Sequence, residues 1–174
     1  MTFLDKITAF LPRGKKEEKQ EYFFAVNIGI EKLTAALWSI EGKELKVLEI
    51  ASENYSSHGE IIVVLDKLLD GVIGLREIEP QKILFGVPSS WILDDNLKDE
   101  YLKILRNITK ELELSPMAYV SESNALIHFL EKKEGVPTTA ILVGFEKNHL
   151  NVTVVRAGKL DGVKIVKRGE STGS

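Results

Sequence analysis

The chain has 174 residues, of which 44% are hydrophobic and 28% are charged. That length suits one ordinary domain or two small ones, and the composition is that of a globular protein with a sizeable core. A formal net charge of −3 gives no basic excess to hold a phosphate backbone, which argues against nucleic acid as a partner. Cysteine is absent, so disulfides and thiolate metal sites are excluded, in keeping with a reducing cytoplasm.

Residues 1–12 predict a short amphipathic helix that ends at Pro12. Asp5 and Lys6 interrupt the apolar stretch, which therefore does not form the core of a signal peptide. No apolar run in the chain approaches the roughly 18 residues of a membrane span. The apolar side chains recur at helical spacing: Phe3, Leu4, Ile7, Phe10 and Leu11.

Residues 13–21 are polar throughout and predict a tether between this segment and the domain. Two interpretations of the N-terminal segment remain open. It is either an anchor for a membrane surface or a partner, helped by basic residues of the tether, or a helix packed on its own domain or frayed at the terminus. The basic residues concerned are Arg13, Lys15 and Lys16.

From Tyr22 onward the hydrophobic periodicity predicts the order β-β-β-α-β-α-β-α. Three strands joined by tight turns, followed by helical crossovers, favour a mixed sheet covered by helices. The continuous apolar run of the fourth strand predicts burial on both faces. The expected elements are strands 22–28, 33–40 and 45–55, helix 61–73, strand 82–87, helix 97–112, strand 118–120 and helix 122–133.

Three more strands are expected at 139–143, 150–155 and 163–168, and they repeat the start of the domain. Residues 25–32 and 141–147 both run as an apolar strand, a glycine, an apolar residue and Glu-Lys. The second copy has its strands but no helices, which would leave one face of its sheet exposed to solvent and one edge strand unpaired. We therefore expect a first subdomain at 22–135 and the start of a second at 136–174, truncated from a longer protein. A complete short protein that borrows a partner's helices is the alternative.

Three segments carry a recognisable pattern. Residues 24–38 form a strand, a turn containing Gly29 and a second strand, and residues 141–160 repeat this hairpin. Residues 118–126 run from a strand into a helix that starts Glu-Ser-Asn-Ala. Together they resemble the actin-like ATPase superfamily of sugar kinases, chaperones and actin. The resemblance implies a ribonuclease H-like mixed sheet, followed by the first strands of a second copy, with two hairpins that hold the phosphates of ATP and its Mg²⁺.

Within that superfamily, the strand at 23–29 and the short stretch before it resemble the pilus-assembly PilM family and the divisome FtsA family. Both families work as platforms for other proteins at the cytoplasmic face of the inner membrane. The resemblance implies protein partners of an envelope assembly, self-association, and peripheral membrane contact through Phe3, Leu4, Ile7 and Phe10.

The first hairpin departs from the superfamily pattern. Asn27 stands in place of the acid that organises Mg²⁺, and an amide is a poorer ligand for a hard cation. Ile30, Glu31 and Lys32 replace the hydroxyl residues that follow Gly29. The charge of Glu31 would oppose a phosphate at this turn.

The second hairpin departs as well. Gly144 stands at the acid position and Glu146 at the glycine position, where a bulky acid obstructs the approach of phosphate to the backbone. His149 and Leu150 replace the usual threonines. We therefore expect no catalytic or metal-binding residue and no efficient hydrolysis of ATP. A displaced metal ligand, Glu31 or Glu146, is the competing interpretation.

Other candidate groups are weaker. Ser89 and Ser90 have no paired base, Asp94 and Asp95 are expected to cap the following helix, and Trp91 is either a partner contact or a lid on the core. The three histidines lack the spacing of metal ligands: His58, His128 and His149.

Three functions follow from these patterns. The first is a PilM-like scaffold with a degenerate ATP site, and the second is an active ATPase or kinase of the same superfamily. The third is a ribonuclease H-like nuclease, which needs several converging carboxylates, and the first strand supplies none.

Overall fold

The computed structural model describes residues 20–42, 44–93, 96–145 and 148–169. The predicted N-terminal helix, most of the tether, the Asp94-Asp95 pair and Glu146 lie outside these residues.

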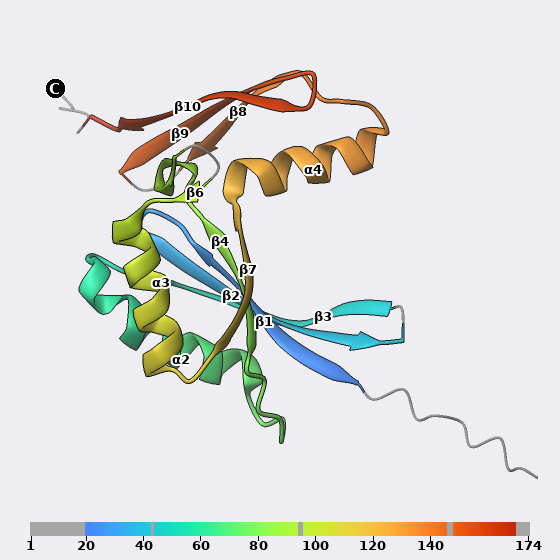
Figure 1. Cartoon of the computed structure of the whole chain (residues 1–174), viewed down its shortest axis with the longest axis vertical. Coiled ribbons are helices and arrows are strands. Elements are labelled where there is room, and N and C mark those ends of the chain that lie inside the picture. Colours follow the sequence, from blue (N-terminus) through green and yellow to red (C-terminus); the bar gives the residue numbers. More distant parts are fainter. Residues whose placement is uncertain (1–19, 43, 94–95, 146–147, 170–174) are drawn as a thin grey trace, which may run out of the picture.

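A five-stranded mixed sheet with the order β3-β2-β1-β4-β7 forms the first subdomain (Figure 1). The first three strands are antiparallel, and β4 and β7 run parallel to β1. The predicted element order and the mixed sheet are confirmed. The strands are β1 (Glu21–Ile28), β2 (Lys32–Glu41), β3 (Glu44–Asn54), β4 (Lys82–Val87) and β7 (Ser115–Ser121).

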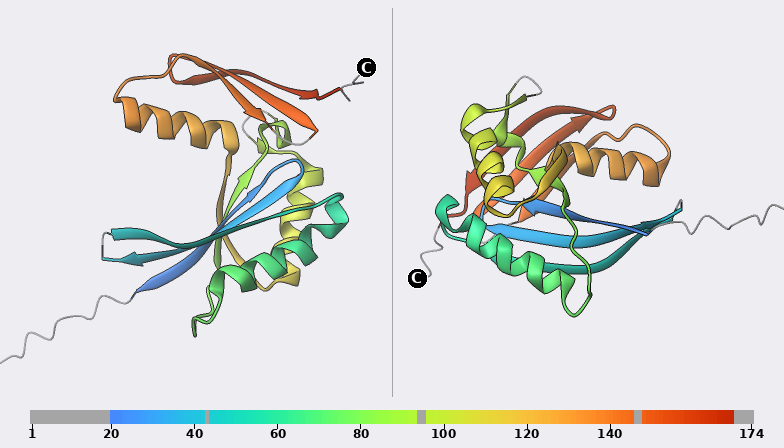
Figure 2. Two further views of the ribbon diagram at one scale, coloured as in Figure 1. Left: turned by 180° about the vertical axis from the view of Figure 1, so that it is seen from behind. Right: turned by 60° about the horizontal axis from the view of Figure 1, so that its bottom comes forward.

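Alternate residues of the central strands build the core. Helices α2 (Ile61–Ile73) and α3 (Asp99–Glu111) both lie on one face of the sheet (Figures 1 and 2). The predicted burial of β4 on both faces is wrong, because these helices bury only every second residue of the strand. The side chains of β1 and β2 that meet the helices are fully buried: Phe24, Val26, Ile28, Leu33, Ala35 and Leu37.

Short connections precede both helices; α2 has the predicted bounds, whereas the start of α3 is shifted. The 3-10 turn η1 (His58–Glu60) precedes α2, which has no side-chain cap. The 3-10 turn η2 (Ser89–Trp91) leads into a small hairpin of β5 (Ile92–Leu93) and β6 (Asn96–Leu97), so α3 begins at Asp99 rather than at residue 97.

Trp91 lies in η2 and belongs to the core. Its side chain is buried, and its ring stacks on that of Tyr101 with 4.3 Å between centroids. Of the two interpretations of Trp91, the lid on the core is the one that the structure supports.

Helix α4 (Glu122–Glu134) joins the first subdomain to a second, three-stranded sheet (Figure 1). Ser121 caps α4 as predicted, since its Oγ accepts the backbone N–H of Asn124 at 3.2 Å. Gly135 ends the helix in the left-handed conformation. The second sheet has the order β10-β9-β8, formed by β8 (Ala140–Phe145), β9 (His149–Arg156) and β10 (Lys159–Lys167).

In the second sheet, Ile141, Val143 and Phe145 of β8 are exposed on the face that their alternation turns away from the buried Thr153. The described part of the chain thus contains no layer over that face. Among the described helices, none is long and apolar enough to cross a membrane.

Replacing Leu65, a fully buried residue of α2, should test the core of the first subdomain. Leu65→Ala removes buried methyl groups and leaves a cavity, so the free energy of unfolding should fall by about 2–5 kcal/mol. Denaturant unfolding measures this loss. The control is Val63→Ala in the same helix, where the side chain is 73% exposed and the change should stay within about 0.5 kcal/mol. Equal losses in both variants would contradict the packing described here.

Candidate functional site

The turn of the first hairpin is tightly closed. The backbone N–H of Gly29 donates to the carbonyl oxygen of Lys32 at 2.9 Å, and a Cβ at position 29 would lie 2.9 Å from that same oxygen. Glycine is therefore required by the close approach of the backbone to itself. The end of β3 supports the turn, because the Tyr55 hydroxyl donates to the Gly29 carbonyl at 2.6 Å and the Tyr55 N–H donates to the Glu31 carbonyl at 3.0 Å.

Asn27 stands next to the turn and is paired with an acid from another element. Its Nδ2 donates to Oε1 of Glu122, the first residue of α4, at 2.7 Å. Gly86 of β4 makes room for this amide, since a Cβ there would lie 2.5 Å from Asn27 Oδ1. An aspartate at position 27 would place two carboxylates in contact. The amide at this position is therefore matched to Glu122.

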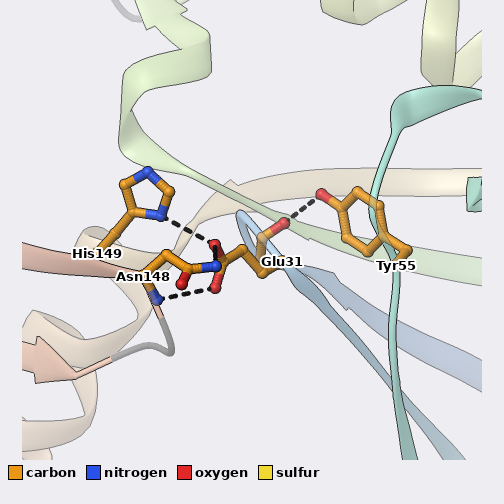
Figure 3. A network of polar contacts seen from close by, with 5 residues as sticks. Glu31, Tyr55, Asn148 and His149 are labelled. Atoms are coloured by element: carbon orange, nitrogen blue, oxygen red, sulfur yellow. Dashed lines mark hydrogen bonds and ion pairs between the residues drawn. The ribbon is translucent and has the colours of Figure 1, made fainter. Parts of the chain in front are cut away.

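Glu31 joins the two hairpins across 117 residues of sequence (Figure 3). One carboxylate oxygen accepts the side-chain amide of Asn148 at 2.7 Å, and the other accepts the backbone N–H of the same residue at 3.2 Å. The His149 Nδ1 lies 3.2 Å from Glu31 Oε1, and the side chains of both residues are about four-fifths buried. Asn148 immediately precedes β9, so Glu31 is bound at the turn of the second hairpin.

These contacts keep the Glu31 carboxylate ionised. The hydrogen bond from the Asn148 side chain lowers the pKa of Glu31 below its ordinary value of 4.5, while desolvation opposes the shift. The Asn148 backbone N–H and the charge of His149 lower the pKa further. A fixed negative charge therefore occupies the space between the two hairpin turns at neutral pH.

The predicted site residues of the first hairpin lie around its turn. Gly29 and Glu31 shape the first turn, the half-buried Ile30 lies between them, and Lys32 contributes its backbone carbonyl while its side chain is exposed. Gly144 is the next-to-last residue of β8, as Asn27 is of β1, so the two hairpins match in register.

Three residues of the site were missed from the sequence: Glu122, Tyr55 and Asn148. Glu122 stands in the strand-to-helix segment that resembles the actin-like pattern, so its place in that pattern could have identified it. Asn148 lies in the predicted second turn, but the contact with Glu31 depends on how the two copies meet. Nothing local marks Tyr55, because its role comes from the position of the end of β3 beside the first turn.

A row of hydroxyl groups lies beside the hairpins. The Ser89 hydroxyl donates to Ser123 Oγ at 2.7 Å, and Ser123 Oγ lies 3.1 Å from Thr153 Oγ1. These bonds join η2, α4 and β9. In both bonds the partner of the serine is another hydroxyl group and not a base. Within the described ranges, no group of three or more His, Asp or Glu side chains could hold a metal ion.

Comparison with known proteins identifies the fold. No protein-family model matches the sequence, and neither does any curated protein. The solved structure of the ethanolamine utilization protein EutJ from Carboxydothermus hydrogenoformans matches with a TM-score of 0.59 and 15% identity over 86% of this chain and 53% of that one. A Bacteroides thetaiotaomicron protein with an actin-like ATPase fold and unknown function gives a TM-score of 0.54 and 10% identity over 92% and 74% of the two chains.

An exopolyphosphatase from Cytophaga hutchinsonii gives a TM-score of 0.51 and 8% identity over 86% and 51% of the two chains. At these identities the similarity shows the fold alone. The chain has the actin-like ATPase fold, as predicted, and spans about half the length of EutJ, 53%.

The contact between Glu31 and Asn148 should make stability depend on pH in a defined direction. The pKa of Glu31 is lowered below 4.5 in the folded state, so its contribution to stability is present above that pH and is lost as the pH falls through the folded value. Glu31→Gln should therefore lower the free energy of unfolding at pH 7, and the difference from the wild type should shrink as the pH falls below 4.5.

Denaturant unfolding across this pH range measures the gap. Glu77→Gln is the matched control, because it removes the same charge from an exposed side chain. A gap for Glu31→Gln that stays constant over the whole range would contradict the assignment.

Proposed function

We propose that this chain is an actin-like scaffold of the PilM kind, in which the phosphate site is closed by the chain's own carboxylate. It would serve the assembly of a pilus or a similar envelope machine at the cytoplasmic face of the inner membrane. Its partners would be proteins of that machine, with self-association as one form of assembly.

The observation that carries this proposal is the position of Glu31. The resemblance to actin-like ATPases implies that phosphate binds between the two hairpin turns, and Glu31 lies there with its carboxylate held by Asn148. A phosphate would have to displace Glu31 from these donors or bind beside a like charge. A phosphate site that is closed without nucleotide is expected of a protein that keeps one conformation to bind its partners.

The polar groups around Asn27 support the same proposal. The Mg²⁺ of an actin-like ATPase would be organised from this position, where the chain offers a neutral amide that already donates to Glu122. ATP and Mg²⁺ are therefore not expected to bind tightly.

An active ATPase or kinase is the second candidate, and Glu122 is the observation that favours it. This carboxylate lies beside Asn27 at the N-terminus of α4, where it could orient a water molecule. The need to displace Glu31 counts against this candidate.

Membrane contact through the N-terminal segment completes the proposal. Phe3, Leu4, Ile7 and Phe10 would enter the interface of the bilayer, and basic residues of the tether would meet anionic headgroups. The inner-membrane location of the proposed scaffold depends on this segment.

Binding and turnover of ATP with Mg²⁺ test the closed site. The wild type should bind weakly and show no turnover, whereas Glu31→Ala should bind about tenfold more tightly because the donors of Asn148 become free. Isothermal titration and phosphate release measure the two properties, with Glu77→Ala as the control for a lost charge. Wild-type turnover at about 1 per second or faster that Glu122→Gln abolishes would establish the ATPase instead.

Flotation with liposomes tests the anchor. The full chain should float with vesicles that contain anionic lipid, and a variant lacking residues 1–12 should stay at the bottom of the gradient. A triple change of Phe3, Ile7 and Phe10 to Ser is the matched control, because it keeps the length and charge of the segment. Equal recovery of all three proteins with the vesicles would remove the anchor from the proposal.

A further inference from the structure

The first sheet has a second face that carries apolar side chains and has no covering layer along β2 and β3 within the described residues (Figures 1 and 2). Helices α2 and α3 lie on the opposite face. We call this second face the open face and define it by six side chains: Phe23, Trp38, Ile40, Leu45, Val47 and Ile50.

Strand pairing places these side chains in rows. Phe23 opposes Trp38, which opposes Val47, so one row crosses β1, β2 and β3. The rings of Phe23 and Trp38 stack with their centroids 6.3 Å apart. In the neighbouring row Ile40 opposes Leu45. Since directly opposed residues point to the same side of a sheet, these rows form one continuous surface.

The surface is exposed as well as apolar. Ile40 is 36% exposed, Val47 44%, Leu45 54% and Ile50 59%. Single exposed apolar residues are ordinary, whereas a contiguous group across three strands is typical of a surface that something covers.

The N-terminal segment of the same chain has the chemistry to cover it. Residues 3–11 place five large apolar side chains on one face at helical spacing. A helix of nine residues is about 14 Å long, and the stretch of β3 from Leu45 to Ile50 is about 17 Å long. The segment therefore matches the open face in both polarity and length.

The point of attachment also fits. The described chain enters the sheet at Glu21 of β1, which pairs with Ile40 in the row that also holds Leu45. Residues 12–19 can span up to about 28 Å, while β3 lies only two strands, or about 10 Å, from β1. The segment can reach the open face without leaving its own molecule.

Charge favours the same contact. The β2–β3 hairpin presents Glu41 and Glu44 at the end of the sheet where the chain enters; Glu44 already pairs with Lys46 at 3.1 Å, so Glu41 is the carboxylate that the tether could meet. The tether carries four basic residues against two acidic ones between positions 12 and 20. Opposite charges at the hairpin end would hold the tether beside the open face.

We propose that residues 3–11 fold back onto the open face and cover β2 and β3 in the free protein. This docking uses the same apolar side chains as membrane contact, so the two states exclude each other. The open face would then bind the segment in the free protein, and the segment would have to dissociate from it before any membrane contact. The docking itself does not rest on the scaffold proposal.

Disulfide trapping tests the docking directly, because the chain contains no cysteine of its own. The variant with Ile7→Cys and Val47→Cys should form an intramolecular disulfide under mild oxidation. The matched control pairs Ile7→Cys with Val63→Cys, which is 73% exposed on α2 across the sheet. Docking predicts that the first pair closes about tenfold faster than the second.

Changing Phe3, Leu4 and Phe10 to Ser in the first variant should abolish this advantage, since the apolar face of the segment is then lost. Equal rates for the two pairs would overturn the proposal. Disulfide-linked dimers in place of the intramolecular disulfide would assign the open face to a second copy and would also overturn the docking.

Fluorescence quenching gives a second readout that needs no cysteine. Trp38 is on the open face and the other tryptophan, Trp91, is buried. Deleting residues 1–12 should raise the acrylamide quenching of Trp38, whereas changing the basic residues of the tether should have a smaller effect. Unchanged quenching after the deletion would contradict the docking. Failure of liposome flotation would leave both tests in force, so the two proposals can be separated.

Discussion

The carboxylate of Glu31, held by Asn148 between the two hairpin turns, is the contact on which the rest of the site depends. It joins the first subdomain to the second sheet across 117 residues of sequence. The first turn can present Glu31 because Gly29 closes tightly and Tyr55 supports it from β3. The second turn can receive it because Asn148 precedes β9 with both its amide groups directed at the same carboxylate.

Around this contact, the residues that depart from the actin-like pattern form a consistent set. Asn27 provides an amide where Glu122 needs a donor, and an acid at position 27 would meet a like charge. Glu31 provides an anion where the superfamily would bind one from the ligand. At both positions the side chain makes a contact within the chain, Asn27 with Glu122 and Glu31 with Asn148. Contacts within the chain therefore explain both residues.

The fold could be predicted because its signals are local. Alternation along β1 and β2, a helical apolar stripe in α2 and the Ser121 cap each specify an element within a few residues. Boundaries were less predictable where tertiary contacts decide them. Pairing of β5 with β6 delayed α3 to Asp99, and β4 proved to be fully buried on one face only. The charge of Glu31 was recognised from the sequence as an obstacle to phosphate, but its partner Asn148 was not. Their contact requires the relative position of two hairpins, which no local pattern encodes.

Nuclear magnetic resonance of the Glu31 carboxyl carbon and the Asn148 amide proton, followed through an acid titration, tests the central claim most directly. If the carboxylate joins the hairpins, both signals should titrate together with a pKa below 4.5, the ordinary value for glutamate. A Glu31 pKa at or above 4.5, with an Asn148 amide signal that does not follow it, would show that the two turns are not joined and would contradict the account.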